Sequence, residues 1–127
     1  MRILLIGHGR MGKLVERHAA EHGCEIAGIA EIQVPLDQVV AQAGAVDVAI
    51  DFSQPEAVVG NLSTLAARGI SVVIGTTGWQ DRERDMREQA GHAGIGVLAA
   101  ANFSLGMHVF AFVVEEAARK FGGLRGV

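Results

Sequence analysis

Three glycines near the start of the chain have the spacing of a phosphate-binding loop. Residues 6–12 read IGHGRMG, so that Gly7, Gly9 and Gly12 form the pattern G-x-G-x-x-G directly after an apolar run. The first glycine of such a loop permits a sharp turn off a strand, the second lets the backbone approach a pyrophosphate, and the third lets a helix pack closely on the sheet. The same pattern also suits a tight turn between strand and helix that binds nothing.

The residues between these glycines complete the candidate loop. The free N–H groups and the positive end of the following helix would face the phosphates. Arg10 can add a positive charge there and His8 can contact phosphate, but neither is assigned a catalytic role. The candidate cofactor contacts in the loop therefore include His8, Arg10 and Met11.

Glu31 supplies the acid that dinucleotide binding expects. It lies 19 positions beyond Gly12 and closes the run 25–30, which reads EIAGIA. A carboxylate at the end of the second strand accepts hydrogen bonds from a ribose diol. The loop and the acid together favour dinucleotide binding over a simple turn.

The residues after Glu31 bear on the choice of cofactor. Ile32, Gln33 and Val34 follow it, so no Lys or Arg stands there to receive a 2′-phosphate, which the carboxylate would repel. The sequence therefore predicts a preference for NADH. NADPH stays open because of the basic residues in and after the glycine loop, Arg10 and Lys13.

Strands and helices alternate along the chain. Short β-branched runs typical of buried strands fall at 3–6, 25–30, 46–51, 71–75 and 96–99, and stretches with helical spacing fall at about 10–22, 55–68, 81–93 and 104–121. This alternation predicts an α/β fold with a doubly wound, mostly parallel sheet of the Rossmann type. Residues 33–45, which contain Pro35, fit either a short helix over 36–43 or a loop.

The ends of the third, fourth and fifth strands carry polar residues that would meet at one edge of the sheet. In open parallel sheets, ligands bind outside the carboxyl ends of the strands. Two adjacent hydroxyls between glycines offer donors where a nicotinamide would lie, and an amide after the fifth strand can bond its carboxamide or ribose. The candidate contacts are Asp51, Phe52, Gly75, Thr76, Thr77, Ala100, Ala101, Asn102 and Phe103.

Some polar residues at these strand ends also suit helix caps. Ser53 and Glu56 have the S-x-x-E spacing of a capping box, and helix capping is the favoured interpretation for both. Thr77 fits either a ligand contact or the cap of the next helix. An N-cap role is as compatible with Asn102 or Ser104 as a cofactor contact.

Five segments together resemble one enzyme family. IGHGRMG, Glu31, IDFSQPE, VIGTTGW and AANFSLG occur in the order and spacing found in 4-hydroxy-tetrahydrodipicolinate reductases, also called dihydrodipicolinate reductases. The resemblance runs from the first strand through the last helix. GTTG followed by AANFS is its distinctive part, because a glycine loop alone would fit many dehydrogenases. Many members have one more residue in that loop, so the chain resembles the branch with the shorter loop.

This resemblance implies an NAD(P)H-dependent oxidoreductase of lysine and diaminopimelate biosynthesis. Members transfer a hydride to a cyclic imine-type dicarboxylate and form tetrahydrodipicolinate. The resemblance puts cofactor contacts at 7–12, Glu31, 75–77 and 100–103. Members continue into a substrate domain with paired His residues, a Lys and a Pro-Ser-Gly-Thr stretch, which this sequence lacks. The chain thus resembles the cofactor half, and we expect it to be inactive alone.

The domain organisation follows from this comparison. We expect a dinucleotide-binding domain over 1–121 and a linker over 122–127 toward a substrate domain, through which a homo-oligomer is possible. The last predicted helix carries so many apolar residues that it is either buried on most sides or awaits a partner. The competing class of function is a stand-alone NAD(H)-sensing or partner-binding module without catalysis, which the missing substrate domain keeps open.

Composition and charge narrow the class of protein further. The net charge of −3 and the absence of Lys or Arg runs argue against nucleic acid, and no apolar stretch reaches the roughly 18 residues of a membrane helix. A small-molecule partner and a cytoplasmic location are expected. His18 and His22 lack a third ligand, so we expect no metal and place both at the margin of the core. Cys24 has no partner for a disulfide.

Overall fold

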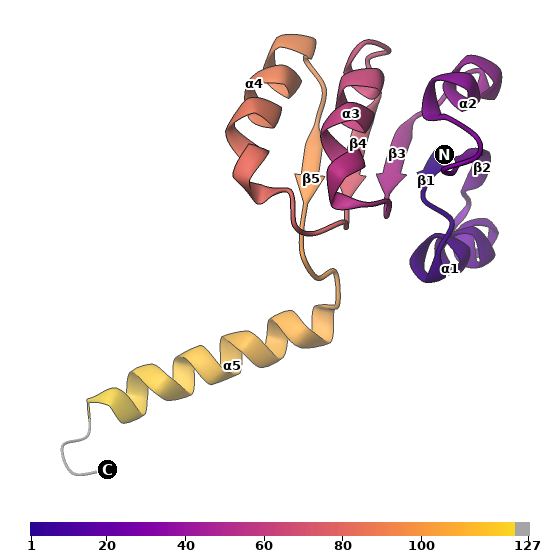
Figure 1. The fold of residues 1–127 in the computed structure, drawn as a ribbon. Coiled ribbons are helices and arrows are strands. Elements are labelled where there is room, and N and C mark those ends of the chain that lie inside the picture. The colour runs from indigo at the N-terminus through magenta and orange to yellow at the C-terminus, as the bar shows by residue number, and fades with distance from the viewer. Residues whose placement is uncertain (124–127) are drawn as a thin grey trace.

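The computed structural model describes residues 1–123 (Figure 1). The predicted strands are all present, and residues 36–43 form a helix rather than a loop. The elements are β1 (Arg2–Ile6), α1 (Arg10–Ala19), the 3-10 turn η1 (Ala20–His22), β2 (Glu25–Ala30), α2 (Leu36–Ala43), β3 (Val48–Asp51), α3 (Pro55–Ala66), β4 (Ser71–Ile74), the 3-10 turn η2 (Gln80–Arg82), α4 (Glu83–Ala93), β5 (Val97–Ala99) and α5 (Leu105–Gly122). Most of the predicted linker, residues 124–127, lies outside the described residues.

The strands form one parallel sheet in the order β2-β1-β3-β4-β5. The chain passes from β1 outward to β2 and then crosses to β3 on the other side of β1, so the sheet is doubly wound and the predicted fold class is confirmed. The direction of winding reverses between β1 and β3. In open α/β sheets, ligands bind beyond the carboxyl ends of the strands at such a point.

Helices α2, α3 and α4 enclose the hydrophobic core on one face of the sheet. Leu4, Ala49 and Val72 lie in register across β1, β3 and β4, and all are buried. They pack against the inner faces of the helices, whose buried residues include Val39, Val40, Val58, Leu62, Leu65 and Met86. Burying apolar surface stabilises the fold by about 25 cal/mol per Å². This core holds the ends of the strands in fixed positions.

The opposite face of the sheet is only partly covered. Right-handed crossovers place α1 on this face, because the step from β1 to β2 runs across the sheet in the opposite direction to the later steps from strand to strand. Within residues 1–123, α1 is the one helix on this face. Ile50, Val73 and Leu98 lie side by side on this face in register. Ile50 and Val73 are half-buried, and Leu98 is 59% exposed. We call these three residues the open strip.

Helix α5 extends away from the sheet (Figure 1). Of the two alternatives predicted for it, burial on most sides is wrong, because its large apolar side chains are exposed, namely Leu105, Met107, Val109, Phe110, Phe112, Val113, Val114 and Phe121. Among residues 1–123, no helix has both the length and the apolarity needed to cross a membrane.

Helix α1 faces the sheet with small residues. Its buried residues are Gly12 and Ala19, and His18 and His22 are both exposed. The prediction that these histidines lie at the margin of the core is therefore wrong. His18 Nδ1 lies 3.0 Å from Glu21 Oε2, and this hydrogen bond holds the pKa of the Glu21 carboxyl below its usual value.

Candidate dinucleotide-binding site

Two of the three loop glycines are required by the fold itself. Gly7 has φ +87°, and a Cβ there would collide with the carbonyl of Phe52, the residue directly after β3. A Cβ on Gly12 would collide with the Gly7 carbonyl oxygen, so glycine lets α1 start directly against the turn. These two positions suit a tight turn as well as a binding loop.

Gly9 separates the two interpretations of the loop. A Cβ on Gly9 would meet nothing within 4 Å, and its φ of −76° is open to any residue. The fold therefore gives no reason for glycine at this position. A ligand that approaches the backbone closely does give one.

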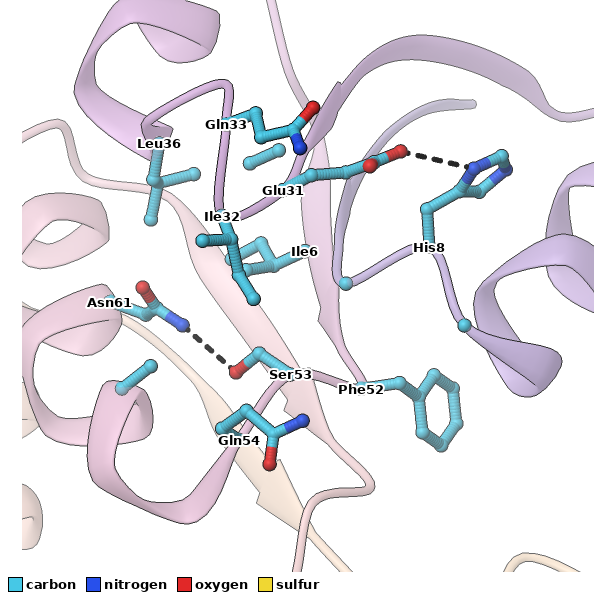
Figure 2. Close-up of a pocket in the computed structure, with 14 residues that line it drawn as sticks. Ile6, His8, Glu31, Ile32, Gln33, Leu36, Phe52, Ser53, Gln54 and Asn61 are labelled. Carbon is cyan, nitrogen blue, oxygen red and sulfur yellow. Dashed lines mark hydrogen bonds and ion pairs between the residues drawn. The ribbon is translucent and has the colours of Figure 1, made fainter.

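A cavity of about 460 Å³ lies on one side of the loop, between the ends of β2 and β3. Glu31 and Ile32 line one wall, and Ser53, Gln54 and Asn61 line the other (Figure 2). Two backbone hydrogen bonds between Glu31 and Val34, each 3.0 Å, hold the turn that carries Ile32. The Ile32 side chain is 94% exposed at the rim, where a flat apolar group such as a purine would cover it.

Glu31, the predicted ribose acid, lies beside His8 of the glycine loop (Figure 2). His8 Nδ1 is 3.2 Å from Glu31 Oε1, and His8 Nε2 is 2.6 Å from Glu16 Oε2 on α1. The sequence analysis identified His8 and Glu31 as candidate contacts independently of each other. No sequence pattern indicated that Glu16 contacts the site, because it lies on a helix face that resembles ordinary charged surface.

A second cavity of about 490 Å³ lies on the other side of the loop, toward β4. It shares Gly9, Phe52 and Ser53 with the first cavity, so that the two meet in front of Gly9. Its other lining residues are Arg10, Met11, Pro55, Gly75, Thr76 and Thr77. The cavities together span the switch point between β1 and β3 and bring the predicted residues of the loop, β2, β3 and β4 into one elongated site.

Asp51 lies behind the wall of this site, not on its surface. Its side chain is 1% exposed and accepts hydrogen bonds from the Ser53 N–H at 2.8 Å, Asn61 Nδ2 at 2.9 Å and the Thr76 hydroxyl at 3.2 Å. The carboxylate thus ties together the chain after β3, helix α3 and the chain after β4. Asn61 was missed by sequence reasoning, although a polar residue one position before Leu62 on a buried helix face was a usable signal.

The predicted capping box of Ser53 and Glu56 is wrong. The N-cap of α3 is Gln54, and no side chain hydrogen bonds to the helix start. The Ser53 hydroxyl instead accepts a 3.1 Å hydrogen bond from Asn61 Nδ2, which draws it toward the Asp51 network.

The Thr pair after β4 lines the second cavity and caps no helix. The next helical turn begins at Gln80, with Trp79 as its N-cap and no side-chain hydrogen bond. Thr76 is held from both sides, since its hydroxyl donates to Asp51 and its carbonyl oxygen accepts a 2.6 Å hydrogen bond from Trp79 Nε1. Thr77 is exposed to the cavity.

The segment after β5 lines neither of the two cavities described above. Ala100 and Ala101 line a third cavity of about 360 Å³ between β5 and α4, which shares Thr76 with the second cavity. Asn102 and Phe103 are exposed beyond it. Ser104 is the N-cap of α5 and accepts a 3.3 Å hydrogen bond from the Met107 N–H, while Asn102 Oδ1 accepts one of 2.8 Å from the Ser104 N–H.

Comparison with known proteins assigns the family of this fold and site. The family described as "Dihydrodipicolinate reductase, N-terminus" matches residues 1–103. The chain belongs to this family. The match covers β1 through β5, and so every element that lines the two cavities.

Curated members of this reductase family are similar over nearly the whole chain. The 4-hydroxy-tetrahydrodipicolinate reductase of Archaeoglobus fulgidus is 34% identical over 94% of this chain and 52% of its own length. The enzyme of the same name from Stenotrophomonas maltophilia is 39% identical over 97% of this chain and 57% of its own length. The chain therefore spans little more than half the length of these relatives.

Solved dehydrogenase structures share the fold of this reductase-family chain. The WlbA dehydrogenase from Bordetella pertussis, solved with NADH and UDP-GlcNAcA, matches 79% of the chain with a TM-score of 0.64 at 23% identity. A putative homoserine dehydrogenase from Archaeoglobus fulgidus matches 78% of the chain with a TM-score of 0.62.

No group of three potential metal ligands occurs within residues 1–123.

Proposed function

We propose that the chain is the NAD(P)H-binding part of a 4-hydroxy-tetrahydrodipicolinate reductase of lysine and diaminopimelate biosynthesis. The observation that carries the proposal is the open space in front of Gly9, where the two cavities meet. No contact within the fold requires a glycine at this position. Membership of the reductase family supports this reaction among the dinucleotide-dependent ones. Homo-oligomerisation beyond this chain and a cytoplasmic location belong to the same proposal.

The proposed binding mode divides the dinucleotide between the cavities. The adenosine half occupies the first cavity, where Glu31 accepts hydrogen bonds from the ribose and Ile32 covers the base. The pyrophosphate lies against the loop and the N-terminus of α1, where backbone N–H groups and Arg10 offset its charge. The nicotinamide half lies in the second cavity beside Phe52 and Thr77. When bound, NAD(P)H supplies the hydride.

The segment after β5 has a separate place in the proposal. Ala100, Ala101, Asn102 and Phe103 are proposed contacts on the family resemblance, at the far end of the nicotinamide half. The Asn102 amide Nδ2 is a donor that can serve the carboxamide or the substrate, since its Oδ1 is already bonded to the Ser104 N–H.

The substrate half of the reaction needs groups beyond those in the site. A dicarboxylate requires positive partners, and reduction of an imine-type bond requires a proton for the nitrogen. Among the residues lining the two cavities, Arg10 is the one Lys or Arg, and it lies at the pyrophosphate position. We propose that the remaining cations and the acid come from the part of the reductase that the relatives have and this chain does not span.

Titration of the purified chain tests the cofactor assignment. NADH fluorescence should change saturably as the chain is added, and ADP-ribose should compete with NADH because it occupies the first cavity. A folded chain, checked by circular dichroism, that gives no saturable change with NADH or NADPH would contradict the proposal. Binding of NADH without competition by ADP-ribose would contradict the assignment of the first cavity.

A further inference from the structure

The indole ring of Trp79 lies behind the Thr pair that follows β4. Trp79 is the one tryptophan in the chain, the residue is 6% exposed, and it belongs to the hydrophobic core together with Met86. Its Nε1–H donates a 2.6 Å hydrogen bond to the carbonyl oxygen of Thr76. A buried indole N–H needs an acceptor. The bond satisfies this need and fixes the direction of the carbonyl.

The carbonyl held by Trp79 belongs to the peptide unit that joins Thr76 to Thr77. This unit is planar and trans, so its C=O and N–H groups point in opposite directions. Thr76 lines both the second and the third cavity, whereas Trp79 lines the third and Thr77 lines the second. The carbonyl therefore points to the side of Trp79, and the Thr77 N–H points to the side of the second cavity.

The chain on either side of this N–H is fixed by other hydrogen bonds. The Thr76 hydroxyl donates to the Asp51 carboxylate at 3.2 Å, and the Gly78 N–H donates to Gln80 Oε1 at 2.8 Å. Thr77 is exposed, and its N–H and hydroxyl make no hydrogen bond to any group within residues 1–123. A rigid turn thus offers one unpaired backbone donor at the second cavity.

We propose that Trp79 is a positioning residue for the nicotinamide half of the cofactor, because its indole N–H holds the Thr76–Thr77 peptide with the Thr77 N–H directed at the second cavity. The inference rests on the proposed dinucleotide site. Without the indole donor, the Thr76 carbonyl has no partner and the peptide turns to find one, which moves the Thr77 N–H away from the ligand. The affinity for the nicotinamide half then falls with the fraction of chains in the competent orientation.

The experiment compares NADH with ADP-ribose, which lacks the nicotinamide half and so does not use the Thr77 N–H. Calorimetric titration near neutral pH measures both dissociation constants without relying on tryptophan fluorescence. In Trp79→Phe, which keeps an aromatic ring and removes the N–H, the ratio of the dissociation constants, NADH over ADP-ribose, should rise about fivefold, the factor that corresponds to one ordinary hydrogen bond. The dissociation constant of ADP-ribose should stay as in the unaltered chain.

A second substitution keeps the test valid if Trp79→Phe does not fold. Benzothienylalanine has the shape of tryptophan with a sulfur atom in place of the indole N–H. Because the chain has one tryptophan, replacing all tryptophan by this residue changes position 79 alone. The same rise in the ratio is expected, since the shape of the ring is kept and the donor is lost.

Ile70→Val is the matched control for loss of packing. Ile70 is buried in the same core, directly before β4, and lines none of the three cavities. Its substitution removes buried apolar volume without removing a hydrogen bond, so it should lower the free energy of unfolding and leave the ratio unchanged. A rise in the ratio in Ile70→Val as well would overturn the assignment to the indole N–H.

The amide resonance of Thr77 gives a spectroscopic test of the same geometry. In nuclear magnetic resonance spectra of the unaltered chain, NADH should move the Thr77 amide proton to lower field as it becomes hydrogen bonded, and ADP-ribose should leave it in place. In the benzothienylalanine chain, the displacement by NADH should be smaller. A Thr77 amide that responds equally to NADH and to ADP-ribose would contradict the proposed direction of this N–H.

The outcomes separate this inference from the proposed function. An unchanged ratio in the folded benzothienylalanine chain, with both ligands bound, overturns the role of Trp79 and leaves the dinucleotide site standing. An equal loss of affinity for both ligands also overturns it, because Trp79 then supports the whole fold and not the nicotinamide half. Failure of NADH and ADP-ribose to bind the unaltered folded chain overturns the proposed function and this inference with it.

Discussion

The hydroxyl of Thr76 donates a 3.2 Å hydrogen bond to the buried carboxylate of Asp51, so that a residue inside the wall fixes one that lines the second cavity. The same carboxylate holds the Ser53 N–H and Asn61. Three neighbours of the proposed cofactor site thus depend on one acceptor that does not line either cavity.

Asp51→Asn should destabilise the fold and weaken NADH binding together. An amide replaces one acceptor oxygen by a donor, which then faces a donor from Ser53, Asn61 or Thr76, and an unsatisfied buried polar group costs about 1–3 kcal/mol. Urea denaturation measures the free energy of unfolding, and fluorescence titration measures NADH binding. Asp81→Asn, at an exposed position of η2, is the control and should change neither.

Gly9→Val should abolish NADH binding with little effect on stability. The side chain has room in the structure but fills the space that a pyrophosphate needs. Gly91→Val in α4 also places a side chain in open space, away from both cavities, and should bind NADH normally. Undiminished NADH titration by a folded Gly9→Val chain would show that the loop is only a turn.

Glu31→Ala should weaken NADH binding by about 1–3 kcal/mol, the scale of charge-assisted hydrogen bonds to the ribose diol. NADPH should lose less, since removal of the carboxylate also removes a repulsion. Glu88→Ala replaces an exposed carboxylate on α4 and should change the binding of neither cofactor. The assignment of Glu31 as the ribose acid would not survive equal losses for NADH and NADPH.

The purified chain should bind NADH but oxidise it with substrate at a negligible rate. Positioning and proton delivery together contribute several powers of ten to an enzymatic rate, and the one Arg that lines the two cavities is a cation that does not release a proton near neutral pH. A coupled assay that generates the unstable substrate in situ, followed by NADH absorbance, measures this. The full-length Stenotrophomonas maltophilia relative is the positive control. Turnover by this chain in the usual range of about 1–1000 per second would contradict the prediction.

The fold and the glycine loop were predictable because their signals are local. Gly7, Gly12 and Glu31 stand at fixed offsets from strand ends, and β-branched runs mark the strands, so sequence spacing carries the information. The position of His18 was misjudged because the sheet-facing residues of α1, Gly12 and Ala19, are small and do not stand out in an apolar pattern.

The interactions that the sequence did not reveal join residues from different elements. Ser53 has the spacing of a helix cap, yet Asn61 binds its hydroxyl. Glu16 in α1 contacts His8 of the preceding loop, and Asp51 at the end of β3 accepts a hydrogen bond from Thr76, which follows the neighbouring strand β4. Such pairings depend on the twist of the sheet and the packing of helices on it, which no local pattern contains.

The open strip and the exposed face of α5 also bear on the heat capacity of the chain. The change in heat capacity on unfolding comes chiefly from apolar surface that becomes hydrated, and Leu98, Phe110 and Phe112 already meet water in the folded state. Their contribution to that change is therefore small. The free energy of unfolding of this chain should vary less steeply with temperature than that of a domain of equal length whose apolar side chains are all enclosed.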